Sequence, residues 1–209
     1  MNNLRLQWPL SLRATGMLLG GLGTFSLFWF WLWDTDSQVF REHGPMENFQ
    51  VGTLLVAAGF MVAGARRTKV SAERLLLAAG ALLFLTMFVL EFDVRPFGSP
   101  LATKIFKGLV RNLFLVVCWG GLAALLLRSR RQVWTTGLSW LLQAPGALTV
   151  LSAAFWCAGG TVDKTKPFAS PEGNFFAEEL LECNGAALML LCAIILWRRL
   201  RQINVPGTP

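Results

Sequence analysis

The chain has 209 residues, of which 54% are apolar and only 15% are charged, and it carries 19 basic against 12 acidic residues. A soluble domain carries about 25% charged residues, so this composition argues against a soluble protein and equally against a disordered one. Four cysteines in a chain of this length also argue against a small secreted protein held together by disulfides.

Several nearly uncharged runs of about 18 residues or more predict an all-α, polytopic membrane protein. We expect a bundle of six transmembrane helices that forms a single integral membrane domain over residues 1–209. Continuous apolarity excludes membrane-spanning strands, whose residues alternate between apolar and polar. Pro145 and Gly146 are expected to kink or break the fifth span. In chain order, the expected spans cover about 14–33, 46–65, 75–93, 109–127, 137–158 and 175–197.

The basic residues predict the orientation of these spans, because cytoplasmic loops carry an excess of lysine and arginine. With six spans both termini share one side, and that side holds twelve of the 19 basic residues and a single acid, Glu73. The twelve are Arg5, Arg13, Arg66, Arg67, Lys69, Arg74, Arg128, Arg130, Arg131, Arg198, Arg199 and Arg201. We therefore expect cytoplasmic N and C termini, and the compact chain favours a bacterial inner (plasma) membrane.

The same basic clusters also bear on the partners of the protein. They are short and flank spans, so they favour contact with anionic lipid headgroups over nucleic-acid binding. Membrane lipids are therefore expected partners and nucleic acid is not. A membrane protein partner and a homo-oligomer remain open alternatives.

Ionisable residues gather at the span ends on the predicted outer side. Glu91 and Arg95 are four residues apart and suit an ion pair, whereas Glu178 and Glu182 place two like charges on one helix face. The apolar parts of the third and sixth spans measure only about 24 and 22 Å of helix, so Glu91 and Glu182 should lie near the outer edge of the apolar layer. The candidate site residues are Glu47, Glu91, Asp93, Arg95, Lys104, Lys107, Arg111, Glu178 and Glu182.

These residue types suggest roles. Carboxylate oxygens suit a divalent cation such as Ca²⁺ or Mg²⁺, which makes Glu47, Glu91, Asp93, Glu178 and Glu182 candidate metal ligands. The candidate general acids or bases are Glu91, Asp93 and Glu182. Arginine and lysine suit phosphate, so the candidate substrate-binding residues are Arg95, Lys104, Lys107 and Arg111.

Structural explanations compete with these roles. A glutamate in a first helical turn is favoured by the helix dipole, which applies to Glu47 and to Glu178 and Glu179, with Asn174 as a candidate cap. It does not apply to Glu91 and Asp93 at a helix C-terminus, where an ion pair with Arg95 and a functional site are equally good explanations.

Missing motifs narrow the function without deciding it. A single histidine, His43, excludes multi-histidine metal sites built from this chain alone, and there is no Walker loop, dinucleotide fingerprint or nucleophile elbow. The leading hypothesis is a carboxylate and Arg/Lys site at the outer face that binds or processes a lipid or lipid-linked phosphate substrate with a divalent cation. A small ion- or proton-coupled transporter and a non-catalytic subunit of a membrane assembly are the alternatives, and enzymatic activity is left open.

Overall fold

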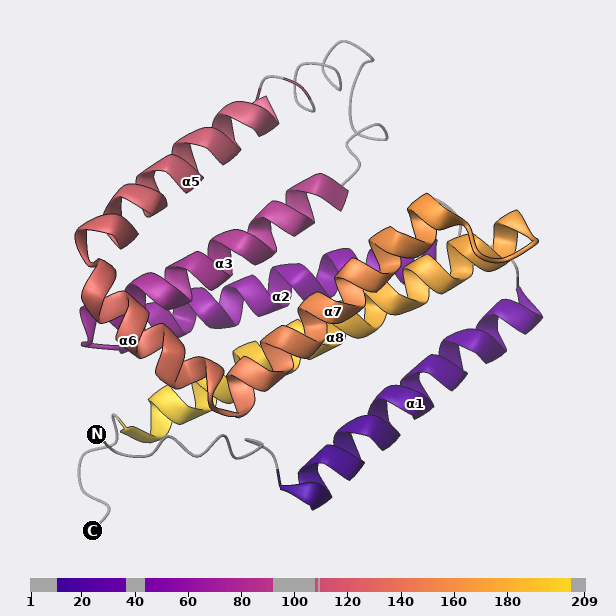
Figure 1. The fold of residues 1–209 in the computed structure, drawn as a ribbon, viewed down its shortest axis with the longest axis horizontal. Helices are drawn as coiled ribbons and strands as arrows, with labels where there is room; N and C mark the ends of the chain where they lie inside the picture. Colours follow the sequence, from indigo (N-terminus) through magenta and orange to yellow (C-terminus); the bar gives the residue numbers. More distant parts are fainter. Residues whose placement is uncertain (1–10, 37–43, 92–107, 109, 204–209) are drawn as a thin grey trace. The chain divides into compact units, whose positions relative to one another are not determined.

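The computed structural model describes residues 11–36, 44–91, 108 and 110–203, and for residues 91 and 201–203 it describes the backbone alone. Helices are the only regular structure in these residues, which contain no strand (Figure 1). The helices are α1 (Leu12–Thr35), α2 (Pro45–Arg67), α3 (Ser71–Glu91), α5 (Arg111–Arg128), α6 (Arg130–Leu141), α7 (Ala144–Thr165) and α8 (Pro171–Ile203). The expectation of an all-α protein is confirmed.

All of these helices except α6 are long and apolar enough to cross a membrane. Large apolar side chains such as Leu27 on α1 and Val116 and Val117 on α5 are exposed along the helices. Extended exposed apolar surface is unfavourable in water but is the normal surface of a helix that faces lipid chains. The chain is therefore an integral membrane protein with six candidate transmembrane helices.

The fifth and sixth spans differ from the sequence-based expectation. Instead of one span over 137–158, the chain forms the short α6 and leaves the helix at Leu142 and Gln143. It then forms α7 from Ala144, seven residues after the expected start of the span. Pro145 lies in the first turn of α7, where its missing N–H has no helical partner to lose. The sixth span lies within α8, whose 33 residues correspond to about 50 Å of helix.

The chain divides into two compact units. The first comprises Met1–Thr53 and Leu138–Cys192. Its apolar core gathers Trp29 of α1, Met46 of α2, and Phe176 and Cys183 of α8. The Trp33 ring stacks on Phe176, with ring centroids 4.4 Å apart and an angle of 16° between the planes.

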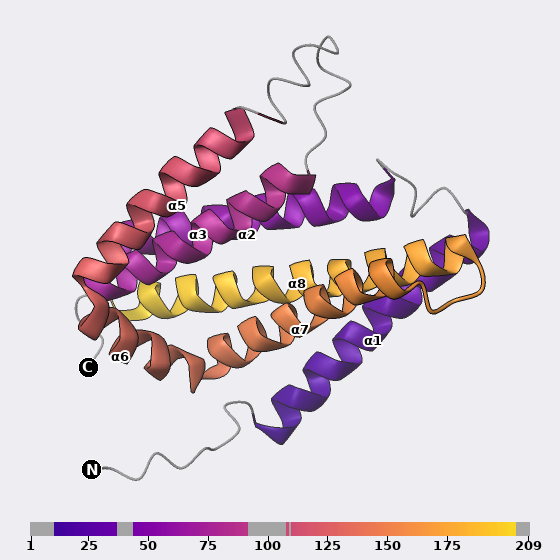
Figure 2. The ribbon, with the colours of Figure 1, turned by 45° about the horizontal axis from the view of Figure 1, so that its top comes forward.

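Within the first unit, α7 and α8 run side by side in opposite directions, as Figures 1 and 2 both show. Small residues allow this close approach: Ser152 of α7 donates a hydrogen bond to the backbone oxygen of Gly185 on α8 at 2.8 Å. On the other side of α8, the Asn184 amide donates to the Ser26 hydroxyl of α1 at 3.1 Å. Hydrogen bonds between buried polar groups thus connect α8 to two neighbouring helices.

The second unit comprises Leu54–Gly137 and Ala193–Pro209. In it, α3 packs against α5, and the Trp119 ring nitrogen donates a hydrogen bond to the Thr86 hydroxyl at 2.9 Å. This bond satisfies an indole N–H that lies in the middle of a membrane span, where water does not reach. Near the C-terminal end of α8, the Arg67 guanidinium lies 5.4 Å from the centre of the Trp197 ring.

Candidate functional site

The turn between α7 and α8 is held by one buried side chain. Asn174 is only 8% exposed, and its side-chain oxygen accepts a hydrogen bond from the Phe168 N–H at 2.9 Å. Its amide nitrogen donates to the backbone oxygens of Phe168 at 2.8 Å and Ser170 at 2.9 Å. Asn174 was expected as a helix cap, but it lies inside the first turn of α8 and closes the preceding loop instead. The cap is Ser170, whose hydroxyl accepts from the Gly173 N–H at 3.0 Å.

The other end of this turn has an unusual backbone. Lys166 follows the last residue of α7 in a left-handed conformation, with φ 45° and ψ 59°, and its N–H donates to the Val162 oxygen at 2.8 Å. A left-handed residue at this position is a common way to end a helix, although glycine is usual there. The chain therefore reverses direction over a few residues whose backbone groups are hydrogen-bonded locally.

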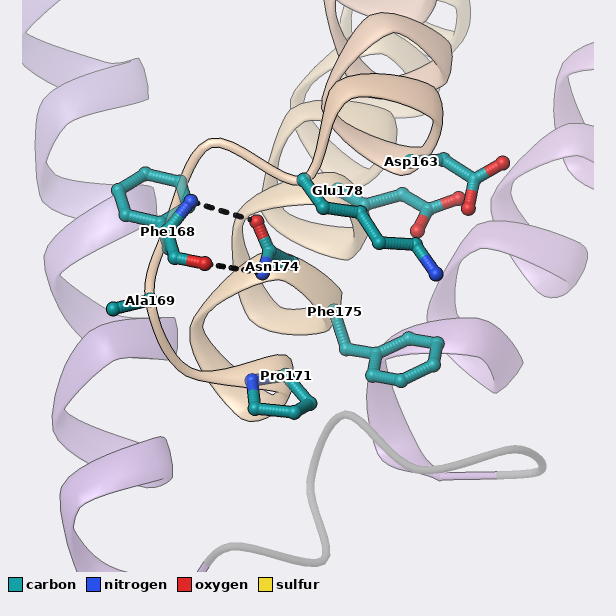
Figure 3. A pocket seen from close by; sticks show the side chains of 8 residues that line it. Asp163, Phe168, Ala169, Pro171, Asn174, Phe175 and Glu178 are labelled. Carbon is teal, nitrogen blue, oxygen red and sulfur yellow. Dashed lines mark hydrogen bonds between the residues drawn. The ribbon is translucent and has the colours of Figure 1, made fainter.

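A pocket of about 270 Å³ lies at this turn (Figure 3). Figure 3 shows the side chains of Asp163 and Glu178 pointing toward one another at its rim, one from α7 and one from α8. Exposed Phe168 and Phe175 add apolar walls. The full lining is Asp163, Lys166, Phe168, Ala169, Pro171, Asn174, Phe175 and Glu178.

The charge of this lining limits what the pocket can bind. Asp163 and Glu178 contribute two carboxylates and Lys166 contributes one ammonium group. A ligand that carries both an ammonium and a phosphate group matches these charges, because carboxylates accept from ammonium N–H groups and lysine is a common phosphate partner. A ligand with only negative charge matches them less well. The aromatic walls suit the apolar part of an amphiphile.

The three glutamates in this part of α8 face different neighbours. Glu178 lines the pocket, whereas Glu179 accepts a hydrogen bond at 2.8 Å from the side-chain amide of Gln50 on α2. Glu182 lies against α7, where a Cβ on Gly159 would be 3.0 Å from its Cγ atom. Glu178 and Glu182 lie four residues apart within α8, so their Cβ atoms are on the same face of the helix, as expected.

Gln50 is a buried polar residue beside Glu179 that was not among the site residues predicted from the sequence. Its side chain is 1% exposed, and its amide nitrogen also lies 3.3 Å from the Glu179 backbone oxygen. The signal was a glutamine between Phe49 and Val51 in an apolar run, since polar side chains inside a span are expensive unless they are paired. The glutamine and the glutamate together connect α2 to α8 beside the apolar core.

The other predicted site residues are only partly described. Glu91 is the last residue of α3 and its side chain is not described; Asp93, Arg95, Lys104 and Lys107 lie outside the described residues. Glu47 lies in the first turn of α2 and is half-buried. Arg111 begins α5 in the second unit, and its Nε atom is buried without a hydrogen-bond partner among the described residues. A joint site of α3 and α8 carboxylates therefore stays a prediction.

The hypothesis that the carboxylates bind a divalent cation also stays a prediction. In the described ranges, no group of three or more histidine, cysteine, aspartate or glutamate side chains is arranged to hold a metal ion. Asp163 and Glu178 alone supply two carboxylates, fewer ligands than Ca²⁺ takes. The divalent-cation site therefore stays a prediction.

Replacement of Gln50 by leucine is expected to destabilise the protein by about 2 kcal/mol, because the Glu179 carboxylate loses a buried donor. Glu179→Gln should cost less, since a glutamine oxygen still accepts from Gln50. Thermal unfolding of the purified protein in detergent measures both effects. Val56→Leu is the matched control, because Val56 is 51% exposed on the same helix. If Gln50→Leu and the control have the same melting temperature, the hydrogen bond between Gln50 and Glu179 does not stabilise the protein.

Comparisons with family models, with curated proteins and with solved structures gave no match for this chain.

Proposed function

We propose that this integral membrane protein binds the headgroup of a zwitterionic aminophospholipid, or of a lipid with the same ammonium and phosphate groups, in the pocket at the α7–α8 turn. The observation that carries the proposal is the lining of this pocket, which brings two carboxylates, one lysine and two exposed phenylalanines together. In this arrangement Asp163 and Glu178 accept from the ammonium group and Lys166 donates to the phosphate. Phe168 and Phe175 contact the glycerol and the start of the acyl chains.

The proposed location of the pocket supports a lipid ligand. The positive-inside rule places Arg128, Arg130 and Arg131 in the cytoplasm. The α7 helix has 22 residues, about 33 Å, so the pocket at its C-terminal end lies at the opposite, outer membrane face. This proposal keeps both termini in the cytoplasm and the protein in a bacterial inner membrane.

Binding is the part of the sequence hypothesis that the described residues support best. Processing of the lipid with a divalent cation depends on Glu91 and Asp93, and it stays a prediction. The alternatives of an ion-coupled transporter and of an assembly subunit need no headgroup selectivity, so the same binding experiment separates them from the proposal.

Headgroup binding can be tested by native mass spectrometry of the detergent-solubilised protein with short-chain lipids. We expect phosphatidylethanolamine to bind more tightly than phosphatidylcholine, whose methylated nitrogen cannot donate hydrogen bonds, and more tightly than phosphatidylglycerol, which lacks an ammonium group. Asp163→Asn and Lys166→Gln should each weaken phosphatidylethanolamine binding about fivefold, as expected for one partly exposed charge pair.

Lys164→Gln is the matched control for this test. Lys164 carries the same charge two residues before Lys166, but it does not line the pocket. Equal affinity for all three lipids, or equal losses in Lys164→Gln and Lys166→Gln, would contradict the proposal and leave the transporter and subunit hypotheses.

A further inference from the structure

The α6 helix is too short to cross a membrane and is separated from the span that follows it. Its 12 residues correspond to about 18 Å, well below the roughly 30 Å of a hydrocarbon layer. At Gln143 the backbone is extended, with φ −119° and ψ 170°, before α7 begins (Figure 1). The structure therefore has a separate helix at the N-terminal end of α7, the end opposite the headgroup pocket.

One face of α6 is apolar and exposed. Trp134, Leu138 and Leu141 follow each other at helical spacings of four and three residues, and they are 75%, 43% and 51% exposed. The other exposed side chains include Thr135 and Ser139, which are polar and point about 100° away from this stripe. An exposed apolar stripe beside a polar face is the pattern of a helix that lies in the plane of a membrane surface.

The charges around α6 indicate which surface it fits. Arg130 and Arg131 form its first turn and are exposed, and Arg128 ends the preceding helix. The sequence contains no aspartate or glutamate between Asp93 and Asp163. A cluster of arginines without acidic neighbours attracts anionic headgroups, and a tryptophan in the apolar stripe suits the depth of the headgroup region.

We propose that α6 is an interfacial helix that lies on an anionic lipid surface, with Trp134, Leu138 and Leu141 inserted below the headgroups and Arg128, Arg130 and Arg131 contacting their phosphates. It holds the basic end of the protein against the leaflet on that side. This site is independent of the proposed headgroup pocket, because it uses other residues and needs a different headgroup charge.

The test places a nitroxide spin label at two neighbouring positions of the full-length protein, in the variants Leu138→Cys and Ser139→Cys. Both are made in a background with Cys118→Ala and Cys157→Ala, since those two cysteines are not buried. The protein is reconstituted into vesicles of phosphatidylcholine alone or with phosphatidylglycerol. Electron paramagnetic resonance then measures the exposure of each label to oxygen, which concentrates in lipid, and to a water-soluble nickel reagent.

With phosphatidylglycerol present, the label at residue 138 should be accessible to oxygen and protected from nickel, and the label at residue 139 should show the reverse. Protection at 138 should fall in pure phosphatidylcholine and in the Arg130→Gln/Arg131→Gln variant, because each arginine removed lowers the ratio of docked to undocked α6 about fivefold. A label at 138 that is open to water in both vesicles overturns the proposal. Equal protection in both vesicles overturns the anionic requirement, and a label at 138 that is shielded from both oxygen and nickel indicates a protein partner instead.

Discussion

Gly146→Ala is expected to lower the melting temperature of the purified protein more than any other alanine substitution of a described glycine. A Cβ atom on Gly146 would lie 2.3 Å from the Leu141 Cα atom and 2.4 Å from the Trp140 oxygen. Both are backbone atoms, so a change of side-chain rotamer cannot relieve the overlap. The backbone at the junction between α6 and α7 must shift instead. Overpacking of this kind costs about 3 kcal/mol. Thermal unfolding in detergent, followed by circular dichroism, measures the loss.

Gly160→Ala on the same helix provides the control, since a Cβ there meets no atom within 4 Å. Alanine is also the better helix former by about 1 kcal/mol, so Gly160→Ala should melt at the same temperature or higher. If the two variants have the same melting temperature, the close contact between Gly146 and the end of α6 does not limit the residue that fits there.

Asn174→Ala is expected to destabilise the α7–α8 turn by about 3 kcal/mol and to abolish headgroup binding. The substitution removes three hydrogen bonds and leaves the backbone N–H and oxygen of Phe168 without the side chain that holds them. Because Phe168 lines the pocket, a change in this turn should also change the pocket. Melting temperature and phosphatidylethanolamine binding by native mass spectrometry report the two effects separately.

Ser170→Ala serves as a graded comparison for Asn174→Ala. It removes one bond, the cap to the Gly173 N–H, and should cost about 1 kcal/mol. The expected order of melting temperatures is the unmodified protein, then Ser170→Ala, then Asn174→Ala. A reversed order, or full headgroup binding by Asn174→Ala, would show that Asn174 does not hold the pocket together.

The helical fold could be predicted from the sequence because membrane spans depend on summed apolarity over about 20 residues. The start of the fifth span could not, because the C-terminal part of α6, from Gly137 to Leu141, carries no charge and continues the apolar run toward α7. A proline inside such a run is compatible with a kinked helix and with a helix start. The structure has a helix start, in which Gly146 packs against the backbone of Trp140 and Leu141 too closely for a Cβ atom. A hydropathy pattern contains no information about such backbone contacts.

The candidate site could also be predicted only in part. Carboxylates at the start of the sixth span could be predicted, but spacing along one helix does not say which neighbour each faces. Glu179 is paired with Gln50, a residue 129 positions away in the chain. The pocket depends on Asn174 and on the reversal at Lys166, and both act through hydrogen bonds to the backbone. Such contacts leave no periodic trace in a sequence.

The most direct measurement of headgroup binding at the α7–α8 turn is photocrosslinking with a phosphatidylethanolamine analogue that carries a photoreactive group near the headgroup. If the headgroup binds at this turn, crosslinks concentrate in the peptide from Asp163 to Glu178 and unlabelled phosphatidylethanolamine competes for them. Lys166→Gln then reduces the crosslinks, whereas Lys164→Gln does not. Crosslinks spread over the exposed faces of α1 and α5, with the same yield in both variants, would contradict headgroup binding at this turn.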